Sequence, residues 1–364
     1  MSDSYVINFK NTIIDLYPNY LKKSFLKKTI EFGLVTDDPK RGDQLPLRAD
    51  NVVDVTDCKT FDEKLEKILI EDNIIKFAEN FEYNKQYRHF CYFKLFNFNR
   101  KKLIDLVNSG EITEFSKDNN KLTESYNKPS LQFINDLIYI KFSYALKNDT
   151  DNRVKFTVIC VIDEKNNIME FRMDKIGIAY KNSYNFYRDK INSILVYFNK
   201  KLGIHVEHID FKAVVEYIKL EKEDMKVYAQ RMRRNGTVAY LESNNNNDEI
   251  VIPILGELHN LIQNNKCLFE SNNETKIIKN KLHEFIDEIE IKSDLPMVKL
   301  KKQDSKIDFG ITHNYKGEEF SFFMFYGDLL GDKEMMDYVR KYFVECCNEI
   351  NEKLQPNGTS DIQM

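Results

Sequence analysis

Three strand-like runs follow one another between residues 137 and 176, and only short polar turns separate them. The runs read LIYIKFSYAL, VKFTVICVID and IMEFRMDKI, and the turn between the last two spans residues 164–167. Such short separations predict an antiparallel meander. A helical pattern follows, in which Ser183 is placed to cap the helix and Gly203 to end it. The first part of the chain is therefore expected to pack helices against an antiparallel sheet.

The last part of the chain repeats this mixture of strands and helices. Helical patterns cover residues 255–263 and 278–289, and three strand-like runs come after them, PMVKLKK, KIDFGITH and EEFSFFMFYGD. An apolar stripe between Met336 and Ile350 predicts a final helix. A sheet with helices in each half predicts an α+β protein of two modules, each a mainly antiparallel sheet packed with helices.

The stretch from Asp210 to Asp248 is expected to hold the boundary between the modules. Apolar residues recur at helical spacing from Phe211 to Met232, which predicts one long helix that Asn235-Gly236 stops. Four consecutive asparagines, at 244–247, follow a short strand-like run. We predict a larger, weakly basic α+β domain at 1–243, an Asn-rich hinge at 244–248 and a smaller acidic α+β domain at 249–364.

The composition is that of a folded protein, with 42% hydrophobic and 31% charged residues. Residues 1–248 carry 40 basic and 37 acidic side chains, whereas residues 249–364 carry 14 and 21. The small basic excess of the first part is far from a nucleic-acid-binding signature by itself. Six cysteines occur without a C-x-x-C pair, and no apolar run has membrane-spanning length. We therefore expect a cytoplasmic protein with no membrane partner.

Asp163 and the triplet Glu170-Phe171-Arg172 follow the order of a metal-dependent nuclease hairpin. Nucleases of the PD-(D/E)xK type place an acid on one strand and acid-x-lysine on its neighbour, to hold a divalent metal by the scissile phosphate. Here arginine replaces the lysine, and a guanidinium suits charge stabilisation but not base catalysis. The run 168–174 also alternates charged and apolar residues, which predicts a strand with one wet and one buried face. In this alternative Asp163, Glu170 and Arg172 are catalytic and a divalent metal is the cofactor.

The segment His205-Val206-Glu207-His208 contains residue types that bind zinc or iron. In a strand, His205 and Glu207 share one face while His208 points to the other. The spacing also differs from H-E-x-x-H, in which two histidines share a helical face. We keep His205, Glu207 and His208 as weak candidates for a metal site, and expect polar residues at an exposed strand end.

The cations near the end of the predicted long helix are the leading candidates for a binding site. Lys226, Arg231, Arg233 and Arg234 lie close together in the sequence, with Tyr228 among them. Arginines near an aromatic side chain can contact phosphates and stack on bases. These four cations are the predicted nucleic-acid-binding residues, with DNA or RNA as the partner.

Common signatures of nucleotide-dependent enzymes are absent from the sequence, which has no G-x-x-x-x-G-K-[ST], G-x-G-x-x-G or G-x-S-x-G motif. The leading prediction is a non-enzymatic binding or adaptor protein without a cofactor. Abundant Lys, Asn and Ile, with Trp 0 against Phe 26 and Tyr 20, indicate an AT-rich bacterium or a mobile element. We therefore favour a nucleic-acid-linked role, such as a component of a phage-defence system. The alternatives are the metal-dependent nuclease and a structural subunit of a protein complex.

Overall fold

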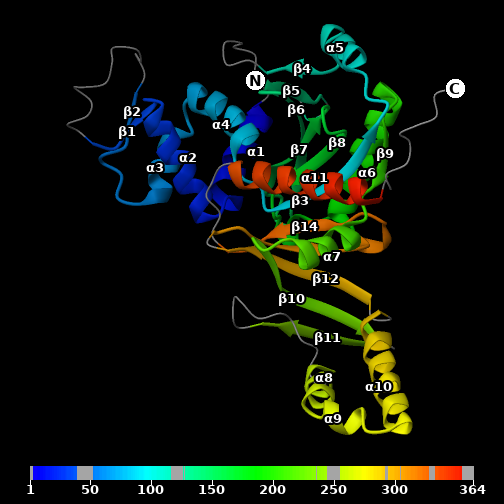
Figure 1. Ribbon diagram of the computed structural model, residues 1–364. Coiled ribbons are helices and arrows are strands. Elements are labelled where there is room, and N and C mark those ends of the chain that lie inside the picture. Colours follow the sequence, from blue (N-terminus) through cyan, green and yellow to red (C-terminus); the bar gives the residue numbers. More distant parts are fainter. Residues whose placement is uncertain are drawn as a thin grey trace, which may run out of the picture. The chain divides into compact units, whose positions relative to one another are not determined.

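The computed structural model describes residues 3–38, 52–115, 126, 128–234, 236–243, 255–291, 294–303, 305–327 and 333–354. Helices pack on mainly antiparallel sheets, so the protein has the predicted α+β fold. The chain forms two compact units (Figure 1). Unit 1 consists of Met1–Ile209 with Tyr326–Met364, and unit 2 consists of Asp210–Phe325.

The sheet of unit 1 is built around the predicted meander. Its neighbouring strands run in the order β4 (Thr113–Glu114), β5 (Ser130–Ile134), β6 (Leu137–Lys147), β7 (Arg153–Asp163), β8 (Ile168–Met173) and β3 (His89–Phe96), and β9 (His205–His208) pairs with β3. β4 and β5 are parallel, and the remaining pairs of this sheet are antiparallel. β-branched and aromatic residues dominate β6 and β7, and such residues fit a pleated surface that is buried.

Helices cover both faces of this sheet. The helices of unit 1 are α1 (Asp3–Asn11), the π-helical η1 (Thr12–Leu16), α2 (Asn19–Glu31), α3 (Phe61–Ile68), α4 (Asp72–Asn84), α5 (Arg100–Asn108), the short η2 (Ile178–Tyr180), α6 (Phe186–Leu202) and α11 (Glu334–Leu354). α6 packs on one face, where the ring centroid of Phe198 lies 5.5 Å from that of Phe142 on β6. α11 covers the opposite face, with Phe343 6.1 Å from Tyr92 of β3, and Figure 1 shows it crossing the strands.

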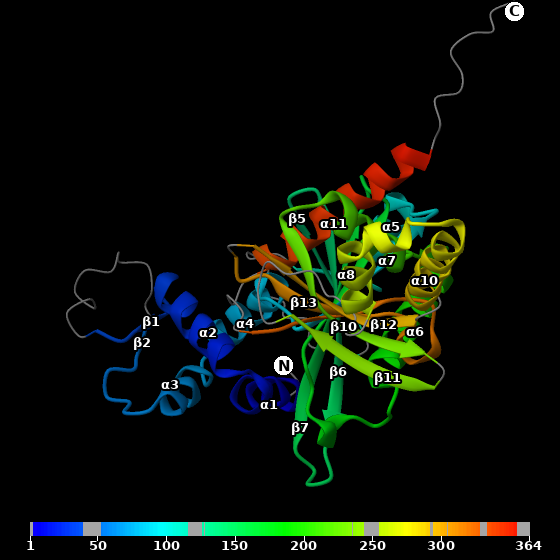
Figure 2. The same cartoon turned by 60° about the horizontal axis from the view of Figure 1, so that its bottom comes forward.

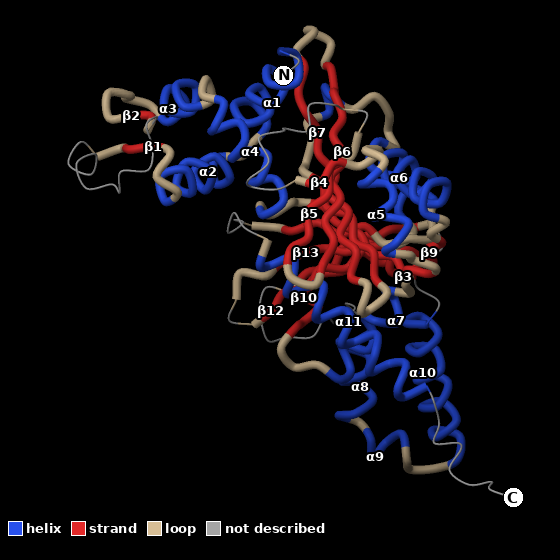
Figure 3. The backbone as a smooth tube through the Cα atoms, turned by 90° about the horizontal axis from the view of Figure 1, so that it is seen from above, coloured by secondary structure: helices blue, strands red, loops and turns tan. Residues whose placement is uncertain are grey.

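The first four helices form a lobe with an apolar core of its own, and Figure 3 shows them side by side. A two-residue parallel pair, β1 (Val35–Thr36) and β2 (Val53–Asp54), belongs to the same lobe. Its core includes Tyr5, Phe9, Ile13, Leu21, Phe25, Leu65, Ile68, Ile74 and Phe81. The lobe is fastened to the sheet at η1, where the Thr12 hydroxyl accepts from the Lys155 amide at 2.7 Å and donates to the Lys155 carbonyl at 2.9 Å.

Unit 2 contains an antiparallel sheet and four helices among its described residues. Its strands run in the order β11 (Thr237–Glu242), β10 (Met225–Arg234), β12 (Asp294–Lys302), β13 (Asp308–Thr312) and β14 (Phe322–Phe325). The helices are α7 (Phe211–Glu221), α8 (Leu255–Asn264), α9 (Lys266–Phe269) and α10 (Asn273–Ile291), with a short η3 (Tyr315–Gly317) before β14. α7 packs on one face of the sheet, where the ring centroids of Phe211 and Phe323 are 4.8 Å apart. α8, α9 and α10 pack on one another around Leu255, Ile262 and Ile286.

The prediction of one long helix from Phe211 to Met232 is wrong. The helix ends at Glu221, and the chain continues as β10, which pairs with β11 in register from Ala229–Glu242 to Arg234–Thr237. Asn-Gly between two strands is a strong hairpin signal because both positions favour positive φ, and Gly236 has a φ of +78°. The interpretation of this dipeptide as a helix stop is therefore wrong. Asp210 caps α7, accepting from the amides of Lys212 and Ala213.

The two units differ from the predicted domains. The expected hinge at 244–248 lies outside the described residues, but the strands on its two sides belong to one sheet, because β10 pairs with β12 from Met225–Lys302 to Arg233–Asp294. The smaller unit is therefore inserted into the larger one. α11, predicted to belong to the smaller acidic domain, completes unit 1.

Candidate functional site

The structure brings the three proposed nuclease residues together, in the interior of unit 1. Asp163 ends β7, and Glu170 and Arg172 lie on the neighbouring β8, on the face that α11 covers. Arg172 Nη2 donates to Glu170 Oε2 at 2.8 Å and to Asp337 Oδ1 of α11 at 2.6 Å. The expectation of a wet face on this strand is wrong, because all six residues of β8 are buried.

Arg340 of α11 occupies the position between the two acids. Its Nη1 donates to Asp163 Oδ2, and its Nε lies 3.6 Å from Glu170 Oε2. The guanidinium thus stands where a divalent cation would have to lie to bridge these carboxylates. Burial raises the pKa of Glu170, against the opposing effect of Arg172. Asp163 also accepts from the amide of Asn166 at 3.1 Å, which fixes the turn after β7. This arrangement is a structural ion-pair cluster.

The candidate metal residues lie on β9 and are not brought into one cluster. The register pairs His205 with Phe96 and His208 with Phe93 of β3, and the two imidazoles pack on those rings at 6.3 and 5.7 Å. Both histidines and Glu207 are exposed. Within the described ranges of the chain, no group of three or more His, Cys, Asp or Glu side chains is arranged to hold a metal ion.

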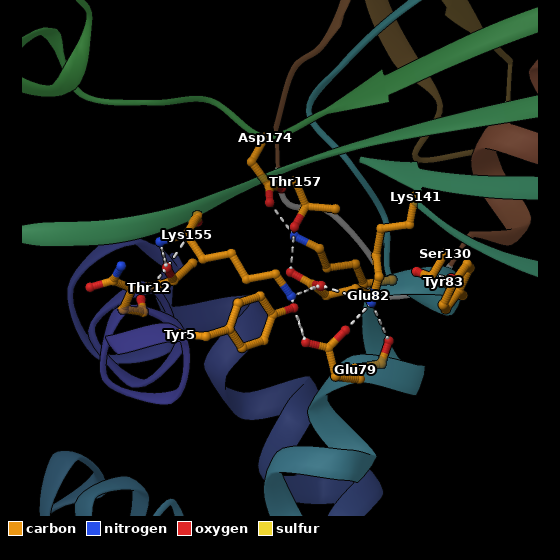
Figure 4. A network of polar contacts seen from close by, with 12 residues as sticks. Tyr5, Thr12, Glu79, Glu82, Tyr83, Ser130, Lys141, Lys155, Thr157 and Asp174 are labelled. Carbon is orange, nitrogen blue, oxygen red and sulfur yellow. Dashed lines mark hydrogen bonds and ion pairs between the residues drawn. The ribbon is translucent and has the colours of Figure 1, made fainter. Parts of the chain in front are cut away.

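A second buried ionic network joins α4 to the meander (Figure 4). Lys155 of β7 donates to Glu79 Oε1 at 2.8 Å and to Glu82 Oε2 at 2.6 Å, and Lys141 of β6 also pairs with Glu79. The Tyr5 hydroxyl of α1 donates to Glu79. The four charged side chains are almost completely inaccessible to solvent, and two cations balance two anions. The network therefore links α1 and α4 to the neighbouring strands β6 and β7.

The network holds the Glu79 carboxylate ionised inside the protein. Burial by itself would raise the pKa of Glu79, but the ammonium groups of Lys141 and Lys155 outweigh it and lower that pKa to about 2. Thr157 donates to the other carboxylate, Glu82 Oε1, at 2.8 Å. All four charges are closed off from water, so each depends on its partners within the protein, and the network offers no ligand a place to bind.

The remaining candidates lie on the sheet of unit 2, on a surface that we call the basic face. It consists of Lys226, Tyr228, Arg231 and Arg233 of β10, Tyr240 of β11, and Lys299 and Lys301 of β12. Figure 2 shows these three strands next to one another. The register pairs Lys226 with Lys301 and Ala229 with Lys299, so a β-bulge between Val227 and Ala229 brings the side chain of Lys226 to the same face as that of Arg231. Arg231 in turn pairs with Tyr240 across β10 and β11.

The basic face combines cations with aromatic rings that reach solvent. Arg231 and Arg233 are exposed, and Tyr240 keeps 44% of its surface accessible. Lys299 Nζ lies 5.3 Å from the ring centroid of Tyr240 and 5.7 Å from that of Tyr228. The five cations share the face with the carboxylates of Glu242 and Asp308, and Asp294 of β12 pairs in register with Arg233. This surface therefore presents positive charge next to π-systems.

Three of the four predicted nucleic-acid-binding residues belong to this face. Arg234 is the exception, since neighbouring residues of a strand point to opposite sides and Arg233 already lies on it. Sequence reasoning missed Tyr240, Lys299 and Lys301, which come from other strands. The signal that could have found Tyr240 is the Asn235-Gly236 hairpin, which fixes its position opposite Arg231.

No family model matches the chain, and no curated protein matches it. In the part of the chain that the structure describes, no helix combines the length and the apolar character needed to cross a membrane.

Proposed function

We propose that the protein is a nucleic-acid-binding protein and that it contacts phosphates through the basic face of unit 2. The observation that carries the proposal is the convergence of Lys226, Arg231 and Arg233 with two lysines of β12 on one accessible sheet face. Lysine and arginine side chains that neutralise phosphates release condensed counterions, which is the main source of affinity for a polyanion. A role within a phage-defence system remains a prediction from composition.

The clustered charged groups of unit 1 support the proposal because, unlike those of the basic face, they are buried and paired with one another. Its acids and arginines neutralise one another in the interior, and Arg340 fills the position between Asp163 and Glu170. A nuclease reading would require those groups to exchange their ion pairs for a metal and a scissile phosphate. A binding role for unit 2 requires no rearrangement of this kind, because its arginines are already accessible.

The test is the salt-dependent affinity of the protein for labelled DNA and RNA, measured by fluorescence anisotropy. The variant is the double substitution Arg231→Glu and Arg233→Glu. The matched control is Lys276→Glu with Lys281→Glu, which makes the same charge change at exposed positions of α10 in the same unit.

We expect the arginine variant to bind at least about 10-fold more weakly, and its plot of log affinity against log salt to flatten by about 0.7–0.9 per arginine that contacts a phosphate. The control should keep the affinity and the slope of the unmodified protein. Equal affinity in the two variants, or no salt-sensitive binding by the unmodified protein, would refute the proposal.

A further inference from the structure

The basic face exposes more than charge. Tyr240 is 44% accessible and Val238, two residues before it on the same face of β11, is 52% accessible. Phosphate contacts need cations and hydrogen-bond donors, and they make no use of an aromatic ring or an apolar side chain. An accessible ring beside arginines is instead the arrangement on which unpaired bases stack.

The side chains are ordered in rows across three strands. One row places Tyr240 opposite Arg231, and the next places Glu242, Ala229 and Lys299 side by side. Ala229 is fully buried although it lies on this open face. Because its methyl group is small, the Lys299 side chain crosses the position and ends near the rings of both Tyr240 and Tyr228. The ring of Tyr240 is therefore held next to two cations, Lys299 and Arg231.

The breadth of the sheet argues against a duplex as the ligand. The major groove, about 12 Å wide, admits a helix or a two-stranded ribbon. The β10–β11 hairpin is not a free ribbon, because β12 pairs with β10 as far as Arg233. Three strands about 4.8 Å apart, with their side chains, exceed that width. The bases of a duplex are also stacked on one another and closed to the Tyr240 ring.

We propose that the ligand of the basic face is a single-stranded polynucleotide, and that one of its bases stacks on Tyr240 while Arg231 and Arg233 contact the adjoining phosphates. This inference rests on the proposed nucleic-acid-binding function and names its substrate class. DNA and RNA single strands share the required chemistry, since each offers unpaired bases on a phosphate backbone.

The experiment compares four labelled probes of equal length and salt, a single strand and a blunt duplex of both DNA and RNA, in anisotropy titrations. The variants are Tyr240→Ala, Tyr240→Phe and Tyr240→Leu, and the control is Tyr184→Ala, which removes an exposed tyrosine from unit 1. Urea unfolding of each variant checks that it is folded, and Tyr240→Leu retains an apolar side chain at this position should the alanine variant unfold.

We expect the single strands to bind more tightly than the duplexes. Tyr240→Ala and Tyr240→Leu should weaken single-strand binding about 10- to 100-fold, while Tyr240→Phe retains it and duplex binding stays unchanged. Tighter binding of the duplexes, or single-strand affinity that is unchanged in Tyr240→Ala and Tyr240→Leu, overturns the inference. If Arg231→Glu with Arg233→Glu still weakens binding in that case, the nucleic-acid-binding function stands and only the single-strand assignment falls.

Discussion

Both units place charged side chains on an antiparallel sheet, and they differ in what lies above those charges. On the meander of unit 1, Lys141, Lys155 and Arg172 are almost completely buried, each beside a carboxylate. On the sheet of unit 2, Arg231 and Arg233 remain open to solvent. A buried charge needs a partner within the protein, whereas an exposed one is solvated and remains available to a ligand. The same residue types are thus paired inside the protein in one unit and remain accessible to solvent in the other.

Removing one buried cation from unit 1 is expected to have the largest effect on stability. Lys155→Met leaves Glu79 and Glu82 short of one ammonium group, and we expect it to lower the free energy of unfolding by about 3–5 kcal/mol. Lys147→Met serves as the control, since its side chain pairs with Asp151 at 2.9 Å on the surface and such pairs contribute about 0–1 kcal/mol. Urea denaturation measures both, and equal stabilities for the two variants would contradict the assigned role of the network.

The same network predicts how stability responds to acid. The pKa of Glu79 is lowered to about 2 from an ordinary value of 4.5, so its contribution is fully present above pH 4.5 and is lost as the pH falls towards 2. The shift corresponds to a loss on the order of 3 kcal/mol over that window. Urea midpoints between pH 6 and 2 should therefore fall more steeply for the unmodified protein than for Glu79→Gln, whose carboxamide does not titrate. Parallel curves would show that Glu79 is not the titrating group.

The smallest expected effect concerns the exposed charges. Replacing Arg231 and Arg233 together by Gln should change the free energy of unfolding by less than about 0.5 kcal/mol, because both side chains are solvated in the folded and unfolded chain. Urea denaturation of this variant and of Lys155→Met compares the loss in free energy of unfolding caused by exposed and by buried cations. A loss above about 1.5 kcal/mol would mean that these arginines serve the fold.

Strands and helix ends that depend only on neighbouring residues could be predicted from the sequence. The strands of the meander follow from dense β-branched and aromatic runs with short turns, and the end of α6 follows from Gly203, which has a φ of +68°. Residues 225–234 were harder, because a bulge between Val227 and Ala229 breaks the alternation of the strand and leaves apolar spacings that also suit a helix. The Asn-Gly pair fits either a helix stop or a hairpin, and only strand pairing decides between them.

Pairings between distant segments could not be predicted in this way. The exposed face expected for β8 is covered by α11, and the partners on α11 of Arg172 and Asp163 are 165 and 177 residues away in the sequence. No local pattern around Glu170 indicates that Arg340 will lie beside it. The same holds for the basic face, where two of the seven residues come from β12, beyond α8–α10. The sequence therefore indicated the candidate cations on β10 but not Tyr240, Lys299 and Lys301 on the neighbouring strands.

Because unit 2 is inserted into unit 1, the ribosome synthesises all of unit 2 before the helix that completes the interior of unit 1. Asp163 emerges from the ribosome 177 residues before its partner Arg340. At about 5–20 residues per second, the interval is roughly 10–35 s. During that time the strands of the meander have been synthesised, but Asp337 and Arg340 of α11, which pair with Arg172 and Asp163, have not. The whole of unit 2 is synthesised before α11, so a chain truncated within unit 2 lacks the helix that covers these charges.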